Sequence, residues 1–116
     1  MRSDRLYLAD IIEAANDVSE FTQDRDHAAF MQNKLLQSAV LQKLIVIGEA
    51  ASRISKETRE KYPDVEWKDI AAFRNIAVHE YFSMDWDIVW RTALKNVPDV
   101  GEKINRIMEK EFRKDA

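Results

Sequence analysis

WKDIAAFRNIAVHEY, residues 67–81, is the stretch that decides the fold of this chain. Its apolar residues Ile70, Phe73 and Ala77 recur at spacings of three and four, as on one face of an α-helix, and Ile76 is a further candidate for this face. We therefore predict a helix that turns this face toward a core.

Four polar side chains lie within eight residues near the end of this helix: Arg74, Asn75, His79 and Tyr81. Because a helix turns about 100° per residue, Asn75 and His79 are neighbours on one face, and Arg74 and Tyr81 share another. Arg74 and His79 lie about 140° apart around the axis. Both reach one ligand only if the long Arg74 side chain bends toward it or the helix loosens near His79. A planar cation, an amide, an imidazole and a phenol suit phosphate chemistry.

The composition favours one all-α domain over residues 1–116. A chain of 116 residues supports a single core, and its 46% hydrophobic and 34% charged content is ordinary for a soluble helical protein. Two glycines and two prolines leave little material for turns and hairpins, which favours helices over strands.

Several classes of function are disfavoured. The absence of cysteine excludes a disulfide framework, a thiolate zinc site and a cysteine nucleophile, and fits a cytoplasmic protein. The two histidines are distant in the chain, so we predict no metal site and no cofactor. We expect no membrane span, because the apolar stretch 35–47 is short and interrupted. A net charge of −3 argues against indiscriminate nucleic-acid binding.

Apolar periodicity and capping residues predict about five helices. They are a first helix from Ser3 or Asp4 to about Phe21, a short second helix capped by Asp24 or Asp26, a long third helix over 33–61, the motif helix capped by Asp64, and a last helix capped by Ser83 or Asp85 that runs to about Phe112. Pro98 lacks a backbone N–H, so we expect a kink or break over 96–99. The charged tail 109–116 is expected to fray.

The predicted third helix is unusually apolar, which indicates a helix covered on more than one side, at the centre of a bundle and with a second chain as one source of cover. Its polar stripe has two interpretations. Either it faces solvent, or Glu49 faces the motif helix and orients Arg74 or His79. Gly48 costs about 1 kcal/mol of helix propensity, which indicates close packing of two helices.

Arg74-Asn75-x-x-x-His79-x-Tyr81, on a late helix of a small helical chain, resembles the HEPN superfamily and, within it, the HepT-type toxins. The likeness extends to the surrounding segments 10–12, 46–50 and 86–90. An isolated Arg-x4-His is a weak signal, but the added Asn, Tyr and flanking segments make it specific for the family. The resemblance implies an HEPN-type up-and-down bundle of about five helices.

The resemblance also implies a function: the toxin of a toxin–antitoxin system, acting as a metal-independent endoribonuclease. It assigns proton transfer to His79, a phosphate clamp to Arg74 and orientation or phosphate binding to Asn75. One histidine does not easily perform both proton transfers, so two motifs would face each other across a homodimer. The antitoxin would be an MNT-type nucleotidyltransferase, resembling an enzyme that transfers AMP to Tyr81.

Structural roles fit the same residues. Arg74 would pair with Glu49 or Glu80, His79 would cap its helix, and Tyr81 would pack its ring. HEPN proteins also include noncatalytic nucleotide- or protein-binding modules that partner a nucleotidyltransferase, which is the alternative function.

The remaining aromatic and imidazole side chains favour structural positions. Trp67, Trp86 and Trp90 lie among helical apolar positions, which favours core or dimer packing over base stacking. His27 falls in a predicted polar loop region, which favours a solvated surface histidine.

Overall fold

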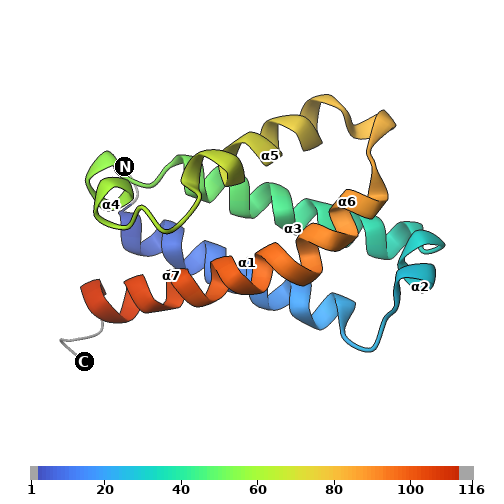
Figure 1. Cartoon of the computed structure of the whole chain (residues 1–116), viewed down its shortest axis with the longest axis horizontal. Helices are drawn as coiled ribbons and strands as arrows, with labels where there is room; N and C mark the ends of the chain where they lie inside the picture. The colour runs from blue at the N-terminus through green and yellow to red at the C-terminus, as the bar shows by residue number, and fades with distance from the viewer. Residues whose placement is uncertain (1–2, 113–116) are drawn as a thin grey trace.

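The computed structural model describes residues 3–112, and these contain helices and no strands (Figure 1). The elements are α1 (Asp4–Thr22), α2 (His27–Met31), α3 (Lys34–Ser52), α4 (Lys56–Lys61), α5 (Trp67–His79), the 3-10 turn η1 (Tyr81–Ser83), α6 (Trp86–Arg91), the π-helical segment η2 (Thr92–Asn96) and α7 (Val97–Phe112). The all-α bundle predicted from the sequence is confirmed.

Helix α3 lies at the centre of the bundle, with α1 and α5 packed along it and α2 and α6 also in contact (Figure 1). Its large apolar side chains enter the core of this one chain, except Leu35, which is 82% exposed. The apolar excess of α3 is therefore satisfied within the chain. The predicted place of this helix at the centre of the bundle is confirmed, and the second chain stays a prediction.

By length and composition α3 is able to cross a membrane, since it has 19 residues and a hydropathy of 1.2. The expectation that no segment is long and apolar enough is therefore wrong. Half of this stretch is buried inside the bundle, and the core helix of a soluble protein passes the same test. Packing against α1 and α5 accounts for its apolar character.

The long helix predicted over 33–61 is two helices, separated at 53–55. Ser55 caps α4, because its Oγ accepts a hydrogen bond from the backbone N–H of Thr58 at 3.2 Å. Ser55 also donates to the Asp4 carboxylate, from its backbone N at 2.9 Å and from its Oγ at 2.6 Å. A contact across 51 residues of chain thus joins the start of α4 to the start of α1.

The predicted helix caps have mixed outcomes. Asp26 caps α2 by accepting from the Ala29 backbone N–H at 2.8 Å, and the Asp85 side chain caps α6. The Asp64 cap is wrong, because α5 begins after Glu66, whose side chain makes no capping hydrogen bond.

The last three helical elements form one run from Trp86 to Phe112 that passes through η2. Pro98 has no N–H to donate, and its ring crowds the carbonyl four residues earlier. The helix is disturbed over 92–96, mostly before the predicted range 96–99, as a π-helical segment, and it is α-helical again from Val97 through Pro98. Helix α7 stays helical through Phe112, and the predicted fraying of residues 113–116 lies outside the described residues.

The tryptophans belong to the core, as predicted. Phe30, fully buried, meets Trp86 edge-on at a centroid distance of 6.3 Å and Trp90 at 4.9 Å. Trp67 is 6% exposed, and its indole N–H donates to the Tyr62 carbonyl at 3.0 Å.

Candidate active site

Helix α5 approaches α3 closely at Gly48, as the sequence indicated. A Cβ at this position would lie 2.5 Å from Arg74 Cβ and 2.9 Å from the Ile70 carbonyl oxygen. Any larger residue would therefore force the two helices apart. This close approach brings Arg74 beside Glu49, the residue that follows Gly48.

Glu49 joins two arginines with its two carboxylate oxygens. Its Oε2 lies 3.2 Å from Arg74 Nε, and its Oε1 accepts from Arg53 Nη2 at 3.0 Å. Arg74 Nη1 donates to Asn75 Oδ1 at 3.0 Å. The Arg74 side chain remains 37% exposed, so its guanidinium is oriented from two sides while still open to a ligand. Ion pairs at this exposure add at most about 1 kcal/mol, so the arrangement orients more than it stabilises.

His79 is the last residue of α5 and is exposed. Within the described part of the chain it makes no hydrogen bond or ion pair. Neither Glu49 nor Asn75 orients His79. Glu49 pairs with Arg74, and Asn75 accepts a hydrogen bond from Arg74. The imidazole is therefore free to meet a substrate or a partner.

Tyr81 lies beyond the helix, because α5 ends at His79 and Tyr81 opens η1. The prediction that Tyr81 shares a helical face with Arg74 is therefore wrong. Tyr81 is 45% exposed, and its ring meets Phe82 edge-on at 5.6 Å. Phe82 itself is fully exposed. Both rings thus stand at the surface just past His79 in the chain.

Exposed apolar side chains accompany these residues along the end of α5 and into α6. Ile76 is 49%, Val78 46% and Ile88 47% exposed. The sequence placed Ile76 as a candidate for the core face, which is wrong, and it did not single out Val78 or Ile88 as exposed. The signal was available: Ile76 and Val78 lie off the face formed by Ile70, Phe73 and Ala77.

The Arg74–Glu49 ion pair confirms that Glu49 faces the motif helix. Both the structural role of Arg74, as the partner of Glu49, and its functional role, as a phosphate clamp oriented by Glu49, predict this pair. Among the described residues no group of three or more His, Asp or Glu is placed to hold a metal ion.

His27 has a partner that the sequence did not reveal. Its Nε2 contacts the Asp87 carboxylate, which joins α2 to α6, while about half of each side chain remains exposed. The two residues are 60 positions apart, so no local pattern announces the pair.

Known proteins are similar in sequence to this chain over nearly its whole length. The family model described as "Ribonuclease HepT-like" matches residues 11–107. A candidate RNase from Methanocaldococcus jannaschii is 41% identical over 103 residues, which cover 89% of this chain and 94% of the relative. A candidate RNase from Caldanaerobacter subterraneus subsp. tengcongensis is 34% identical over 111 residues, 96% of this chain and 99% of its own.

A relative from Thermococcus cleftensis, named as a HepT ribonuclease, is 32% identical over 106 residues, 91% of this chain and 96% of its own. No solved structure matches the chain. Because the family model and these full-length relatives cover the bundle and the Arg74–Tyr81 motif together, the chain belongs to the HepT-like ribonuclease family.

Proposed function

We propose that this chain is the toxin of a toxin–antitoxin system and cleaves RNA in the cytoplasm without a metal ion, as one HEPN domain over residues 1–116. The observation that supports this most is the Arg74 guanidinium, oriented by Glu49 and Asn75 yet open to solvent, with the exposed His79 five residues later. Family membership supports the same substrate class.

RNA supplies its own nucleophile for this reaction. A base removes the proton of the 2′-hydroxyl, the 2′-oxygen attacks the adjacent phosphorus, and the bond to the 5′-oxygen breaks. An acid then protonates the departing 5′-oxygen, and a cyclic phosphate remains. Imidazole serves either proton-transfer role near neutral pH, which suits His79. Arg74 would hold the phosphate oxygens with paired N–H groups while negative charge develops on them.

A homodimer would complete this site. Arg74 and His79 diverge by about 140° around α5, and one imidazole is asked for two proton transfers. A second copy would bring a second histidine to the same phosphate. The exposed Ile76, Val78 and Phe82 next to His79 offer the apolar surface for it.

Sedimentation of wild type and Phe82→Glu tests the dimer. We expect wild type to sediment as a dimer at micromolar concentration and Phe82→Glu, still folded, as a monomer without cleavage. A wild-type monomer that cleaves RNA would remove the composite site.

Cleavage of a labelled RNA by purified variants tests the catalytic roles. We expect His79→Ala and Arg74→Ala to lose about 100-fold or more in rate, because each removes a group from the reacting phosphate. His27→Ala and Arg106→Ala are matched controls on α2 and α7 that should retain full rate. Cleavage should survive EDTA.

A folded His79→Ala protein that cleaves as fast as wild type would refute the assignment. The noncatalytic module that binds a nucleotide or a partner protein would then be the better hypothesis.

Tyr81 is the proposed point of control by an MNT-type nucleotidyltransferase antitoxin. Its phenol oxygen would attack the α-phosphorus of ATP, releasing pyrophosphate and passing its proton to the transferase. Tyr81 suits this better than Tyr62, whose hydroxyl donates to Glu111 at 2.6 Å. The added AMP would place negative charge and bulk near Arg74 and repel RNA.

Intact-mass measurement after co-expression with the neighbouring transferase tests this control. Adenylate additions should map to Tyr81 and vanish in Tyr81→Phe. A fully neutralised complex with unmodified Tyr81 would leave inhibition to steric masking.

A further inference from the structure

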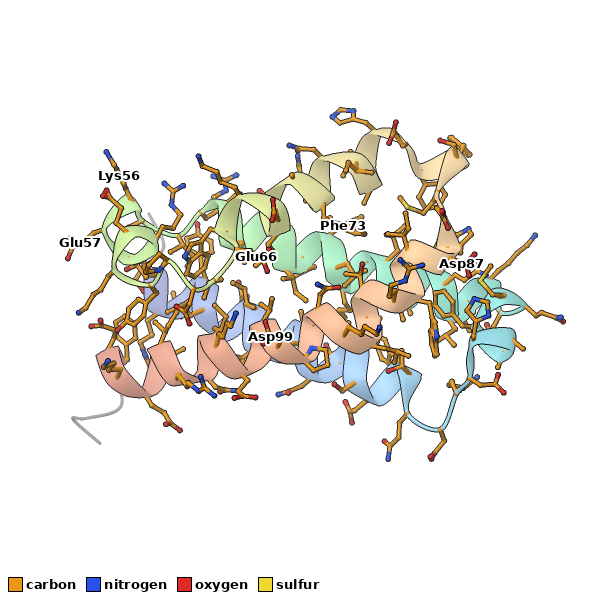
Figure 2. The ribbon with its side chains drawn as sticks, viewed as in Figure 1. Lys56, Glu57, Glu66, Phe73, Asp87 and Asp99 are labelled. Atoms are coloured by element: carbon orange, nitrogen blue, oxygen red, sulfur yellow. The ribbon has the colours of Figure 1, made fainter. Side chains whose placement is uncertain are left out.

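Beside its contact with Gly48, α5 borders a cleft of about 190 Å³ that the proposed chemistry does not use. Leu44 and Ile47 of α3 form its floor. Phe73 of α5 and Val100 of α7 line opposite sides, and Figure 2 shows Phe73 directed from α5 toward the run of helices α6 and α7. The cleft is therefore an apolar groove between two helices that rest on a third.

Carboxylates surround this apolar floor. Asp69 comes from the first turn of α5, and Glu66 directly precedes this helix. Asp99 comes from α7, and Figure 2 labels Glu66 and Asp99. Asp99 pairs with Lys103 at 3.1 Å, whereas Glu66 and Asp69 make no ion pair among the described residues. No lysine or arginine is among the described residues that line the cleft. An occupant that is both apolar and cationic would match this surface.

These features fit RNA and a second copy of this chain less well. RNA carries phosphates, which Glu66 and Asp69 would repel. A second copy of this acidic chain, related by a twofold axis, would present the same carboxylates to its partner and gain no charge complementarity. The volume is also below the roughly 300–1,000 Å³ of typical small-molecule sites. It fits one large side chain presented by a larger molecule.

We propose that this cleft is a docking site for a different protein, which inserts one large apolar side chain over Leu44 and Ile47 and places Arg or Lys beside Glu66 and Asp69. Such an anchor flanked by cations is a common way for a helix to bind a groove. Phe73, which forms one wall, directly precedes Arg74. A bound segment would therefore rest against the helix that positions the phosphate clamp.

A fluorescein-labelled helical peptide serves as the probe, with one Trp as anchor and Arg four residues before and after it. Its binding to the full chain is measured by fluorescence anisotropy at low salt. The protein variants are Glu66→Gln/Asp69→Asn, which removes the charges, and Val100→Phe, which fills the cleft. The matched control Glu13→Gln/Glu20→Gln removes the same charge from exposed positions on α1, which does not line the cleft.

We expect the charge variant to weaken binding roughly threefold to tenfold, as for two exposed ion pairs. Val100→Phe should weaken it about tenfold or more, and the control should bind like wild type. A peptide with Glu in place of Arg should not bind.

Three results would overturn the proposal: equal losses in the charge variant and its control, unchanged binding to a folded Val100→Phe protein, or equal binding of the Glu peptide. A wild-type dimer that Val100→Phe converts to monomer would also overturn it, by assigning the cleft to a second copy. The experiment measures binding and not cleavage, so it stands or fails separately from the ribonuclease proposal.

Discussion

The two flanks of α5 are packed in opposite ways. On one flank the helix meets α3 with no room for a methyl group at Gly48, and Arg74 is held there by Glu49. On the other flank the Phe73 ring borders an open cleft of about 190 Å³. One helix thus combines a tightly fitted side, which orients a charged group, with a loosely packed side that has room for a partner.

This difference has a physical basis. Close-packed backbones transmit a small displacement directly to the side chains that they carry. A cleft with spare volume absorbs the same displacement by moving a side chain. Four substitutions test this difference.

Gly48→Ala should produce the largest effect, because its Cβ would lie 2.5 Å from Arg74 Cβ. We expect a loss of about 2 kcal/mol in the free energy of unfolding, after a gain of about 1 kcal/mol in helix propensity. The melting temperature should fall by roughly 5–10 °C. The matched control is Gly101→Ala, where the nearest atom, Ala15 Cβ, is 3.3 Å away. Equal thermal shifts in both variants would show that the α3–α5 contact is not specially tight.

Glu49→Gln should affect cleavage rather than folding. Glutamine keeps a hydrogen-bond acceptor but loses the charge that holds Arg74, so we expect the cleavage rate to fall about tenfold. The free energy of unfolding should change by less than about 1 kcal/mol, because the pair is partly exposed. Glu102→Gln breaks a comparable exposed pair with Arg106 and should leave the rate unchanged. An unaltered kcat and KM in folded Glu49→Gln would make the ion pair merely structural.

Val100→Phe tests the loosely packed flank by adding several carbon atoms to the cleft. We expect the free energy of unfolding to stay within about 1 kcal/mol of wild type, because spare volume receives the ring. A larger side chain at Val100 would then cost less than one methyl group at Gly48. Chemical denaturation of the two variants under the same conditions measures this directly, and a larger loss for Val100→Phe would contradict the contrast.

Asp4→Asn, which alters the hydrogen bonds between α1 and α4, should have the smallest effect, seen in how the free energy of unfolding depends on pH. Partial burial opposes ionisation of Asp4, but hydrogen bonds from Ser55 and Thr58 outweigh it and hold the pKa of Asp4 below its usual range. A lowered pKa means that this contribution is present above the unfolded pKa of the carboxyl and is lost as pH falls through the folded one. Asp4→Asn should therefore lose less stability than wild type between about pH 5 and pH 3. Identical acid denaturation curves would show that these hydrogen bonds add nothing to stability.

Local patterns in the sequence were sufficient for the helical class, for the short segments that hold the caps of α2 and α6, for the packing of the tryptophans and for the close packing at Gly48. Each depends on residues within one or two turns of a helix, or on how much apolar surface a segment must bury. The choice of Asp26 over Asp24 and of Asp85 over Ser83 came from the structure. The position of Glu49 opposite the motif helix was one of two interpretations of the polar stripe, and the ion pair with Arg74 in the structure selected it. Family membership came from the spacing of Arg74, Asn75, His79 and Tyr81.

Only the tertiary structure decided the features that depend on distant segments meeting. Asp4 accepts hydrogen bonds from Ser55, the cap of α4, across 51 residues, and His27 contacts Asp87 across 60. The choice of Arg74 rather than His79 as the partner of Glu49 required the depth at which α5 rests on α3. The cleft at Phe73 also required the tertiary structure. The space between two helices depends on all the side chains packed around them, so no single segment of the sequence predicts it.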